Sequence, residues 1–524
     1  MQRRDVLLGA GAVAVSRPSL AQAPKVLKFI PQADLAVIDP VMTTAYVTRH
    51  HAYMIYDTLY GFDEAYNAQP QMVEGHTVED GGKRVTMKLR PGLRFHDNTP
   101  VLAKDAVASV KRWAVRDSLG QVMNSVLEEL SAPDDQTILF RFRRPFPMLF
   151  EALGKPSTPV CFVMPERIAN TAPTTAITDT IGSGPFRFLT NERVQGARFA
   201  YEKFAGYVPR PEGTPSWTAG PKRVFLDRIE WQVTPDAATA SAALQSGEID
   251  WWEQPTGDLQ PVLRRNRNVV LEIPDPTGLM AIARFNHLHP PFDKPAVRRA
   301  LLGAVNQADY MTAVIGTDRS LWRDGVGFFP PGTPMASDAS LDALTSTPDM
   351  DKVKRDLAAA GYNGERVVLI AASDFPSLNA LAQVNNDMLR RAGMNVEYVS
   401  TDWGSVLQRR ASRETGERGG WNVFCTFWSG VDMFNPGVHQ SLRGHGAQAW
   451  FGWPTIPRVE ELRAAWFEAP DLAAQQAVAR QMQEVAFQEV PYLPLGQYFQ
   501  ATAYRRGITG VLKGLPLFWN VEKA

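Results

Sequence analysis

The pattern of apolar and polar residues changes along the chain, and each change predicts a different element. Alternation in 85–90 and 138–142 predicts half-buried strands. Apolar residues at helical spacing predict helices at 46–60 and 103–116. The turn Gly182-Ser183-Gly184-Pro185 precedes another alternating run, which predicts that the chain turns sharply and enters a sheet at 186–189.

Strands and helices then follow one another regularly. We expect strands at 26–31, 224–233, 366–371, 396–399, 421–427 and 492–498, and helices at 235–246, 352–360, 378–392, 458–467 and 471–489. Strand and helix in turn predict an α/β architecture. Trp251 and Trp252 are adjacent and therefore point to opposite faces of a strand, so we expect one in the core and one at the surface.

Length and charge limit the possible classes of protein. A chain of 524 residues exceeds the usual size of one core, so two or three domains are expected. The 55 basic residues balance 55 acidic ones, and no basic face is evident, which argues against a nucleic-acid partner. After the N-terminus, no apolar run is long enough to span a bilayer.

The N-terminus has the features of an export signal. Arg3 and Arg4 precede a short apolar run, and small residues lead to a predicted cleavage after Ala21. The paired arginines fit the twin-arginine route, and the general secretory route is an equal alternative. No cysteine stands at the cleavage point, so no lipid anchor is expected. Cys161 and Cys425 are expected to be buried free thiols, although an oxidising compartment would allow a disulfide.

The sequence lacks the motifs of common enzyme classes. It contains no nucleophile elbow, no His-Glu-x-x-His and no phosphate-binding loop ending in Gly-Lys-Ser/Thr. His287 and His289 could share one face of a strand and bind a metal, but without a nearby third ligand they are more often plain polar contacts. We therefore predict no enzyme activity, no cofactor and no metal site.

Several segments resemble one known family. They are LRPGLRFHDNTP (89–100), DAVASVKRW (105–113), GSGPFRF (182–188), GEIDWWEQP (247–255) and the Phe-Asn and Pro-Phe-Asp run at 285–293. Together they resemble the family 5 extracellular solute-binding proteins, the peptide- and nickel-type binding components of ABC importers. Asn98 replaces the family's glycine and is expected to adopt the left-handed conformation. Leu102 replaces a helix-capping threonine.

The resemblance implies a fold and a division into domains. The implied fold is the α/β, bilobal periplasmic-binding-protein fold (type II, large peptide-binding class), with two α/β lobes, a hinge and an extra inserted α+β domain. The expected parts are an export signal at 1–21, lobe I at 22–60, 180–278 and 491–524, an inserted domain at 61–179, and lobe II at 279–490.

The resemblance also implies a function. The chain would be the periplasmic component of an ABC importer, a monomer that captures a small solute between its lobes, such as a short peptide or peptide-like compound. It would deliver that solute to a membrane permease served by ATPase subunits. The alternatives are an envelope enzyme on the same scaffold, and a binding protein for sensing or chaperone roles.

The segment after the buried strand at 421–427 is implied to lie in the cleft. Asp432 is the candidate for a ligand amino group, although it stands one residue later after the tryptophan than in peptide-binding members, and a turn or cap is the alternative. Arg284 could meet a ligand carboxylate or form a surface ion pair. The other candidate binding residues are Trp403, Trp428 and Phe434, which offer flat apolar faces, together with Asp34, Tyr46 and Trp453.

Overall fold

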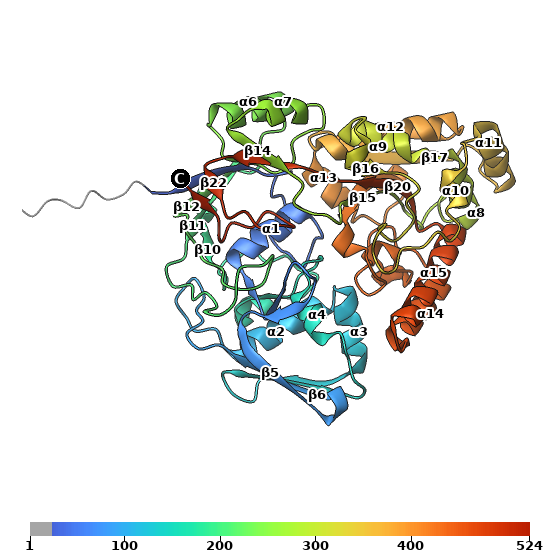
Figure 1. Ribbon diagram of the computed structural model, residues 1–524. Helices are drawn as coiled ribbons and strands as arrows, with labels where there is room; N and C mark the ends of the chain where they lie inside the picture. Colours follow the sequence, from blue (N-terminus) through green and yellow to red (C-terminus); the bar gives the residue numbers. More distant parts are fainter. Residues whose placement is uncertain (1–23) are drawn as a thin grey trace, which may run out of the picture.

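The computed structural model describes residues 24–524, so the predicted export signal lies outside the described residues. Two large lobes lie side by side, and a smaller domain lies against both (Figure 1). Each part has its own sheet, with seven, six and four strands. The predicted bilobal α/β fold is therefore confirmed.

Lobe I is built on a seven-stranded sheet in the order β10-β11-β12-β1-β13-β21-β14. The strands are β1 Val26–Ile30, β10 Phe186–Phe188, β11 Arg198–Lys203, β12 Arg228–Gln232, β13 Trp251–Trp252, β14 Val269–Glu272 and β21 Thr502–Arg505. β1 runs parallel to β12 and β13. The helices are α1 Tyr46–Ile55, α6 Ala237–Ser246 and α7 Gln260–Arg265.

Both faces of the lobe I sheet are covered, which corrects one expectation. Trp251 and Trp252 do point to opposite faces, but they are only 2% and 5% exposed. Trp251 packs with Phe29 and Phe518, whereas Trp252 belongs to the core cluster under α6 and α7. Neither tryptophan is at the surface, because the helices cover the face that the sequence pattern left open.

Lobe II is built on a six-stranded sheet in the order β16-β20-β15-β19-β17-β18. The strands are β15 Leu279–Phe285, β16 Trp322–Arg323, β17 Arg366–Ala372, β18 Asn395–Thr401, β19 Val423–Ser429 and β20 Tyr492–Tyr498. The helices are α8 Pro295–Ala300, α9 Gln307–Ile315, α10 Asp342–Thr345, α11 Met350–Ala359, α12 Pro376–Arg391, α13 Trp403–Arg409, α14 Pro457–Glu468 and α15 Leu472–Glu489.

The chain returns to lobe I later than the expected boundary at 491. β20 pairs with β15 along the whole lobe II strand, and only β21 joins the lobe I sheet, beside β14. The backbone thus crosses from lobe I to lobe II at 273–278 and returns at 499–501. These two crossings form the hinge.

The small domain is an α+β unit between β1 and β10 of lobe I. Its sheet has the order β5-β6-β8-β7, formed by β5 Val73–Glu79, β6 Arg84–Leu89, β7 Leu127–Ser131 and β8 Thr137–Phe142, with helices α2 Ala103–Ala114, α3 Ser118–Val126, α4 Leu149–Gly154 and α5 Glu166–Ala169. Short strand pairs complete the chain: β2 Asp57–Thr58 with β9 Phe162–Val163, β3 Tyr60–Phe62 with β4 Ala68–Pro70, and β22 Ile508–Thr509 with β23 Glu522–Lys523.

The backbone at Asn98, the start of α2 and the state of the two cysteines agree with the sequence predictions. Asn98 adopts a φ of 67°, the left-handed conformation expected of it. Leu102 starts α2 without a side-chain cap, and the Asp105 carboxylate accepts its amide hydrogen at 2.8 Å instead. Cys161 and Cys425 are both buried free thiols.

The glycine turn at 182–185 packs directly against the end of α1. The Gly184 amide donates to the Ile55 carbonyl at 3.0 Å, and α1 ends at Ile55, five residues before the end of the expected helix. A Cβ on Gly182 would stand 1.8 Å from the Ile55 oxygen, so only glycine fits there.

We predict that Gly182→Ala lowers the thermal unfolding midpoint, because the added methyl group must push the turn away from α1. The cost should exceed about 2 kcal/mol, as is usual when backbone must move in a packed region. Gly75→Ala is the matched control, since a Cβ there meets no atom within 4 Å. Equal midpoints for both variants in differential scanning calorimetry would contradict this packing.

Candidate functional site

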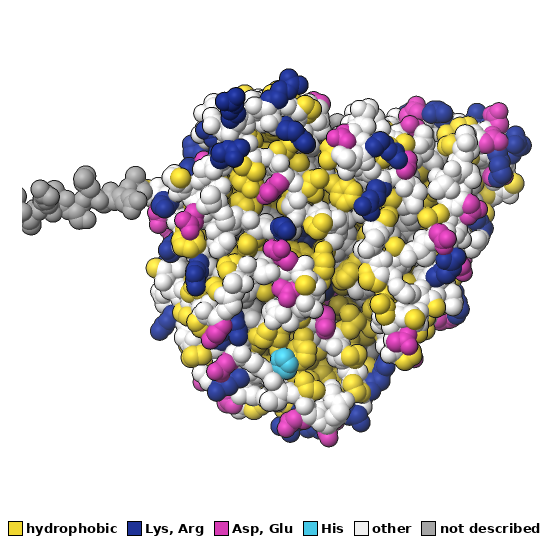
Figure 2. All heavy atoms as spheres, in the orientation of Figure 1, with side chains coloured by type: hydrophobic (Ala, Val, Ile, Leu, Met, Phe, Trp, Pro, Cys, Tyr) yellow, Lys and Arg dark blue, Asp and Glu magenta, His cyan; other side chains and the backbone are white. Residues whose placement is uncertain are grey.

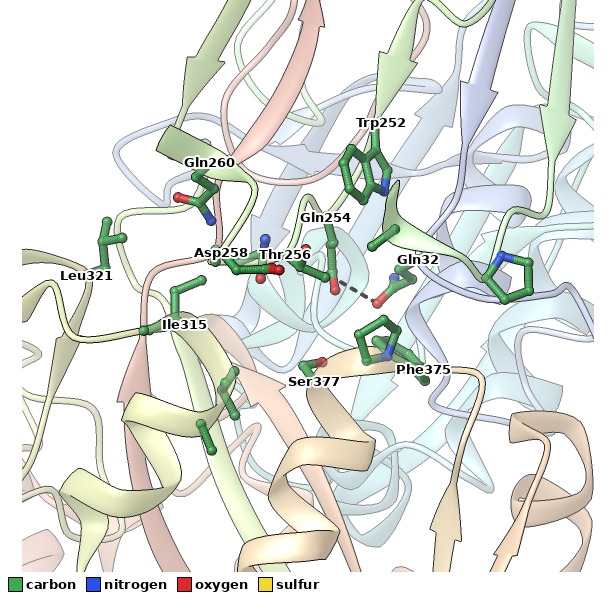
Figure 3. Close-up of a pocket in the computed structure, with 18 of the residues that line it drawn as sticks. Gln32, Trp252, Gln254, Thr256, Asp258, Gln260, Ile315, Leu321, Phe375 and Ser377 are labelled. Atoms are coloured by element: carbon green, nitrogen blue, oxygen red, sulfur yellow. Dashed lines mark hydrogen bonds between the residues drawn. The ribbon is translucent and has the colours of Figure 1, made fainter. Parts of the chain in front are cut away.

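A cavity with a volume of about 740 Å³ lies between the two lobes. Figure 3 shows Gln32, Trp252 and Gln260 on its lobe I side, facing Ile315 and Phe375 of lobe II. Pockets for small molecules have this size and often lie between domains. We refer to it as the interlobe cavity.

Polar groups with unused hydrogen-bonding capacity line the interlobe cavity. Gln254 Nε2 donates to Gln32 Oε1 at 3.2 Å, which leaves Gln32 Nε2 without a partner among the described residues. Asp34 Oδ1 is likewise buried and unpartnered within residues 24–524. Such groups can bind a polar solute that enters the cavity.

Two carboxylates from opposite lobes face the interlobe cavity. Asp34 follows β1 of lobe I, and Asp374 follows β17 of lobe II. Burial raises the pKa of Asp374, and the negative charges of Asp402 and Asp34 raise it further, although the Trp403 amide donates to Asp374 at 2.7 Å and opposes the shift. The two carboxylates therefore create a negative potential at this end of the cavity.

Tyr46 of α1 and Asp432, which follows β19, join the lobes directly. The Tyr46 hydroxyl donates to Asp432 Oδ2 and accepts the Ser429 amide hydrogen. Asp432 Oδ1 accepts the Thr158 amide at 2.9 Å, and Arg49 Nη1 lies 3.8 Å from Oδ2. Burial raises the pKa of Asp432, and the positive charge of Arg49 opposes that shift. We call the Tyr46, Ser429 and Asp432 contact the latch.

A small cavity of about 30 Å³ adjoins the latch, and its walls are mostly aromatic. Tyr46, Phe375, Trp403, Phe427, Trp428 and Trp450 line it, together with Arg410 and smaller residues. Gln32, Ala33 and Phe375 also line the interlobe cavity, so the two cavities share a wall. We call this space the aromatic cavity.

Two further cavities flank the seam between the lobes. One of about 70 Å³ lies at the hinge, where the Ser429 hydroxyl donates to Asp275 at 2.7 Å. The other, of about 220 Å³, lies between the small domain and lobe II, and Phe434 and Tyr66 line it. The hinge cavity is also lined by Arg49, His50 and Glu253.

The structure brings together some of the predicted binding residues and separates others. Tyr46, Trp403 and Trp428 share the aromatic cavity. Asp432 lies at the latch, Asp34 lines the interlobe cavity and Phe434 lines the 220 Å³ cavity. These predicted residues therefore lie along the seam, but in several separate spaces.

Arg284 and Trp453 lie away from all these cavities. Arg284 is fully buried and donates to the carbonyls of Ser441, Trp450, Phe451 and Pro491 at 2.6–3.2 Å, so it is neither a surface ion pair nor available to a carboxylate. Trp453 is 5% exposed and packs against Trp421 in the core. Both side chains are enclosed within lobe II, Arg284 on the inner strand β15 and Trp453 beside Trp421.

The sequence analysis missed Arg410. This residue stands seven positions after Trp403, directly after α13, so both side chains face the same side of the helix. The spacing could have identified Arg410 from the sequence, because Trp403 was already a candidate binding residue. Its aromatic neighbours Trp450 and Phe451 come from a distant segment and carry no such local signal.

No metal centre is found among the described residues. Residues 24–524 contain no group of three or more metal-ligating side chains. His287 and His289 each contact a carbonyl oxygen, at 3.1 and 2.8 Å. No helix in the described part of the chain is long and apolar enough to cross a membrane.

Comparison with known proteins gives consistent matches. Residues 67–448 match the family described as bacterial extracellular solute-binding proteins, family 5 middle. The whole chain is 37% identical to a probable peptide ABC transporter periplasmic-binding protein, y4tO, of Sinorhizobium fredii, over the full length of both. It is 24% identical to the glutathione-binding protein GsiB of Escherichia coli, covering 97% of this chain and 96% of that protein.

Solved structures share the fold. The agropinic acid complex of AgaA from A. tumefaciens R10 superposes with a TM-score of 0.78 at 22% identity, covering 95% of this chain and 99% of that one. A dipeptide-binding protein of Pseudoalteromonas, in complex with Met-Leu, has a TM-score of 0.78 at 18% identity and covers 95% and 100%. At these identities the likeness shows the fold alone.

We predict that Tyr46→Phe destabilises the closed seam, because it leaves the Ser429 amide and one Asp432 oxygen without a partner. Each unsatisfied buried group costs about 1–3 kcal/mol, so the unfolding midpoint in urea should fall. Tyr56→Phe is the control, since the buried Tyr56 hydroxyl makes no hydrogen bond within residues 24–524. An unchanged midpoint in Tyr46→Phe would show that the latch contributes nothing.

Proposed function

The chain belongs to the bacterial extracellular solute-binding proteins of family 5 and is the substrate-binding component of an ABC importer; we propose that it holds a short peptide or peptide-like solute in the interlobe cavity. The single observation that carries this proposal is a 740 Å³ cavity with one wall from each lobe. A solute there would contact both lobes and favour their closed arrangement. The protein would then dock on a membrane permease and release the solute.

The proposal includes the location and the route of export. Members of this family are periplasmic or extracellular, which agrees with the signal predicted from Arg3, Arg4 and the cleavage after Ala21. We propose that the mature protein is a monomer without a lipid anchor. Delivery would depend on separate permease and ATPase subunits, because no nucleotide-binding motif occurs in the sequence.

The negative end of the interlobe cavity supports a ligand with an amino group. Asp34 has an unpartnered carboxylate oxygen, and Asp374 faces it from the other lobe. An ammonium group between them would relieve their repulsion and tie the lobes together. Asp432 remains the alternative, but both of its oxygens already have protein partners.

The relatives agree with this class of ligand without defining it. Two of the similar proteins are named for binding peptide or glutathione, and two were solved in complex with agropinic acid or Met-Leu. An envelope enzyme on the same scaffold is disfavoured by the missing catalytic motifs. A sensing or chaperone role would use the same cavity, and growth of a deletion strain on the ligand as sole nutrient would distinguish uptake from those roles.

We predict that ligand binding compacts the protein. The lobes are joined by two backbone crossings only, so free protein should sample open arrangements, and a solute that contacts both lobes should shift the population to the closed one. Small-angle scattering should therefore show a smaller radius of gyration at saturating ligand. An unchanged radius at saturation would contradict capture by closure.

A second prediction concerns the amino group of a dipeptide. Asp34→Asn should weaken binding of Met-Leu by more than about tenfold, because the charge-assisted contact is lost, whereas Asp432→Asn should change it by less than about threefold. Isothermal titration calorimetry measures both. The reverse order would assign the amino group to Asp432 instead.

A further inference from the structure

Arg410 is a buried cation without a partner. Its side chain is 3% exposed, and within residues 24–524 its guanidinium makes no hydrogen bond or ion pair, with Nε fully enclosed. A buried charge is costly unless it is paired or hydrogen-bonded. A bound anion would therefore stabilise the buried charge of Arg410.

The other buried arginines of the described chain differ from Arg410 in this respect. Each donates to at least one carbonyl or carboxylate oxygen. They are Arg49, Arg90, Arg112, Arg284, Arg298, Arg443 and Arg463. The fold thus supplies acceptors for buried arginines elsewhere and leaves Arg410 without one.

Aromatic rings surround the Arg410 guanidinium. Its Cζ lies 5.5 Å from the ring centroid of Trp403, 5.6 Å from that of Trp450 and 4.7 Å from that of Phe451. These rings stabilise the cation but accept no hydrogen bonds in the plane of the guanidinium. Burial lowers the pKa of Arg410 to about 9, so the group is still charged at neutral pH.

A second donor without an acceptor lines the same cavity. The indole Nε1 of Trp428 is buried and has no partner among the described residues. The Thr44 hydroxyl accepts from Trp450 Nε1 at 3.3 Å, which leaves its own hydrogen available. No acidic side chain lines this cavity. The lining therefore offers donors and a positive charge, but no carboxylate to pair with Arg410.

We propose that Arg410 and Trp428 bind a carboxylate of the imported solute in the aromatic cavity. This inference rests on the proposed function and adds that the ligand is an acid. The planar fork of an arginine matches the two oxygens of a carboxylate, and the indole adds a third donor. Arg410 therefore replaces Arg284, the candidate predicted from the sequence, as the residue that contacts the ligand carboxylate.

The size of the aromatic cavity fits this group. Its volume of about 30 Å³ exceeds the roughly 10–15 Å³ that one water molecule needs by the same measure, so it takes a small group such as a carboxylate but not a whole peptide. Gln32, Ala33 and Phe375 line both this cavity and the interlobe cavity, so the two spaces adjoin each other. The rest of the solute would lie in the interlobe cavity, with an amino group towards Asp34 and Asp374.

The stability of ligand-free variants tests whether Arg410 is a binding or a structural residue. Arg410→Met removes a buried charge without a partner, so its unfolding midpoint should be unchanged or higher. Arg284→Met is the matched control and should lower the midpoint strongly, because it removes the donor to four carbonyl oxygens. A midpoint for Arg410→Met as low as that of Arg284→Met would overturn the inference.

Binding of an acid and its amide tests the ligand contact. Calorimetry compares Met-Leu with Met-Leu amide in the wild type, Arg410→Met, Arg410→Lys and Trp428→Phe. We expect the wild type to prefer the acid by at least about tenfold. Arg410→Met should lose that preference, and the other two variants should keep part of it. Equal binding of acid and amide by the wild type, or a preference retained in Arg410→Met, would overturn the inference.

A separate measurement distinguishes failure of the proposed function from failure of the Arg410 site. If the wild type binds neither form of Met-Leu, the ligand class proposed above is wrong, and acetate against acetamide then decides the role of Arg410. Tryptophan fluorescence at constant ionic strength is the measurement, because three tryptophans line the cavity. A response to acetate alone that is lost in Arg410→Met supports the carboxylate site, and no difference between the two probes overturns it.

Discussion

Two backbone crossings at the hinge are the constraint on which the rest of the structure depends. β14 and β21 pair in the lobe I sheet, and β15 and β20 pair in the lobe II sheet, so the crossings at 273–278 and 499–501 lie between two rigid strand pairs. Side-chain contacts such as the latch also join the lobes. Lobe II can therefore move as a unit if those contacts break, and a solute in the interlobe cavity would replace or reinforce them.

Several polar groups along the seam are incompletely satisfied. Arg284 in the core has four carbonyl partners, whereas Arg410, Trp428, Gln32 and Asp34 at the seam each have an atom without a partner among the described residues. Buried groups of this kind are rare in folded proteins and usually have a functional reason. Positive charge in the aromatic cavity and negative charge at Asp34 and Asp374 would orient a solute that carries both an acid and an amine.

The sequence predicted the elements well because their periods are local. β6, β8 and β17 follow from alternation or apolar runs, and α12 and α15 from helical spacing. The assignment of β20 to lobe I was wrong, because strand pairing depends on distant partners rather than on the strand itself. The same limit applies to the site. Trp428 was found through a motif, but the availability of Arg410 and the enclosure of Arg284 depend on groups far along the chain.

Motion of the lobes tests the account most directly. Fluorescent labels at Ser246→Cys on α6 and Gln383→Cys on α12 would report the distance across the interlobe cavity, and the native Cys161 and Cys425 would not interfere because both are buried. Single-molecule energy transfer should show a broad or double distance distribution in free protein that narrows to the shorter distance when the solute binds. One distance, identical with and without bound solute, would contradict capture between moving lobes.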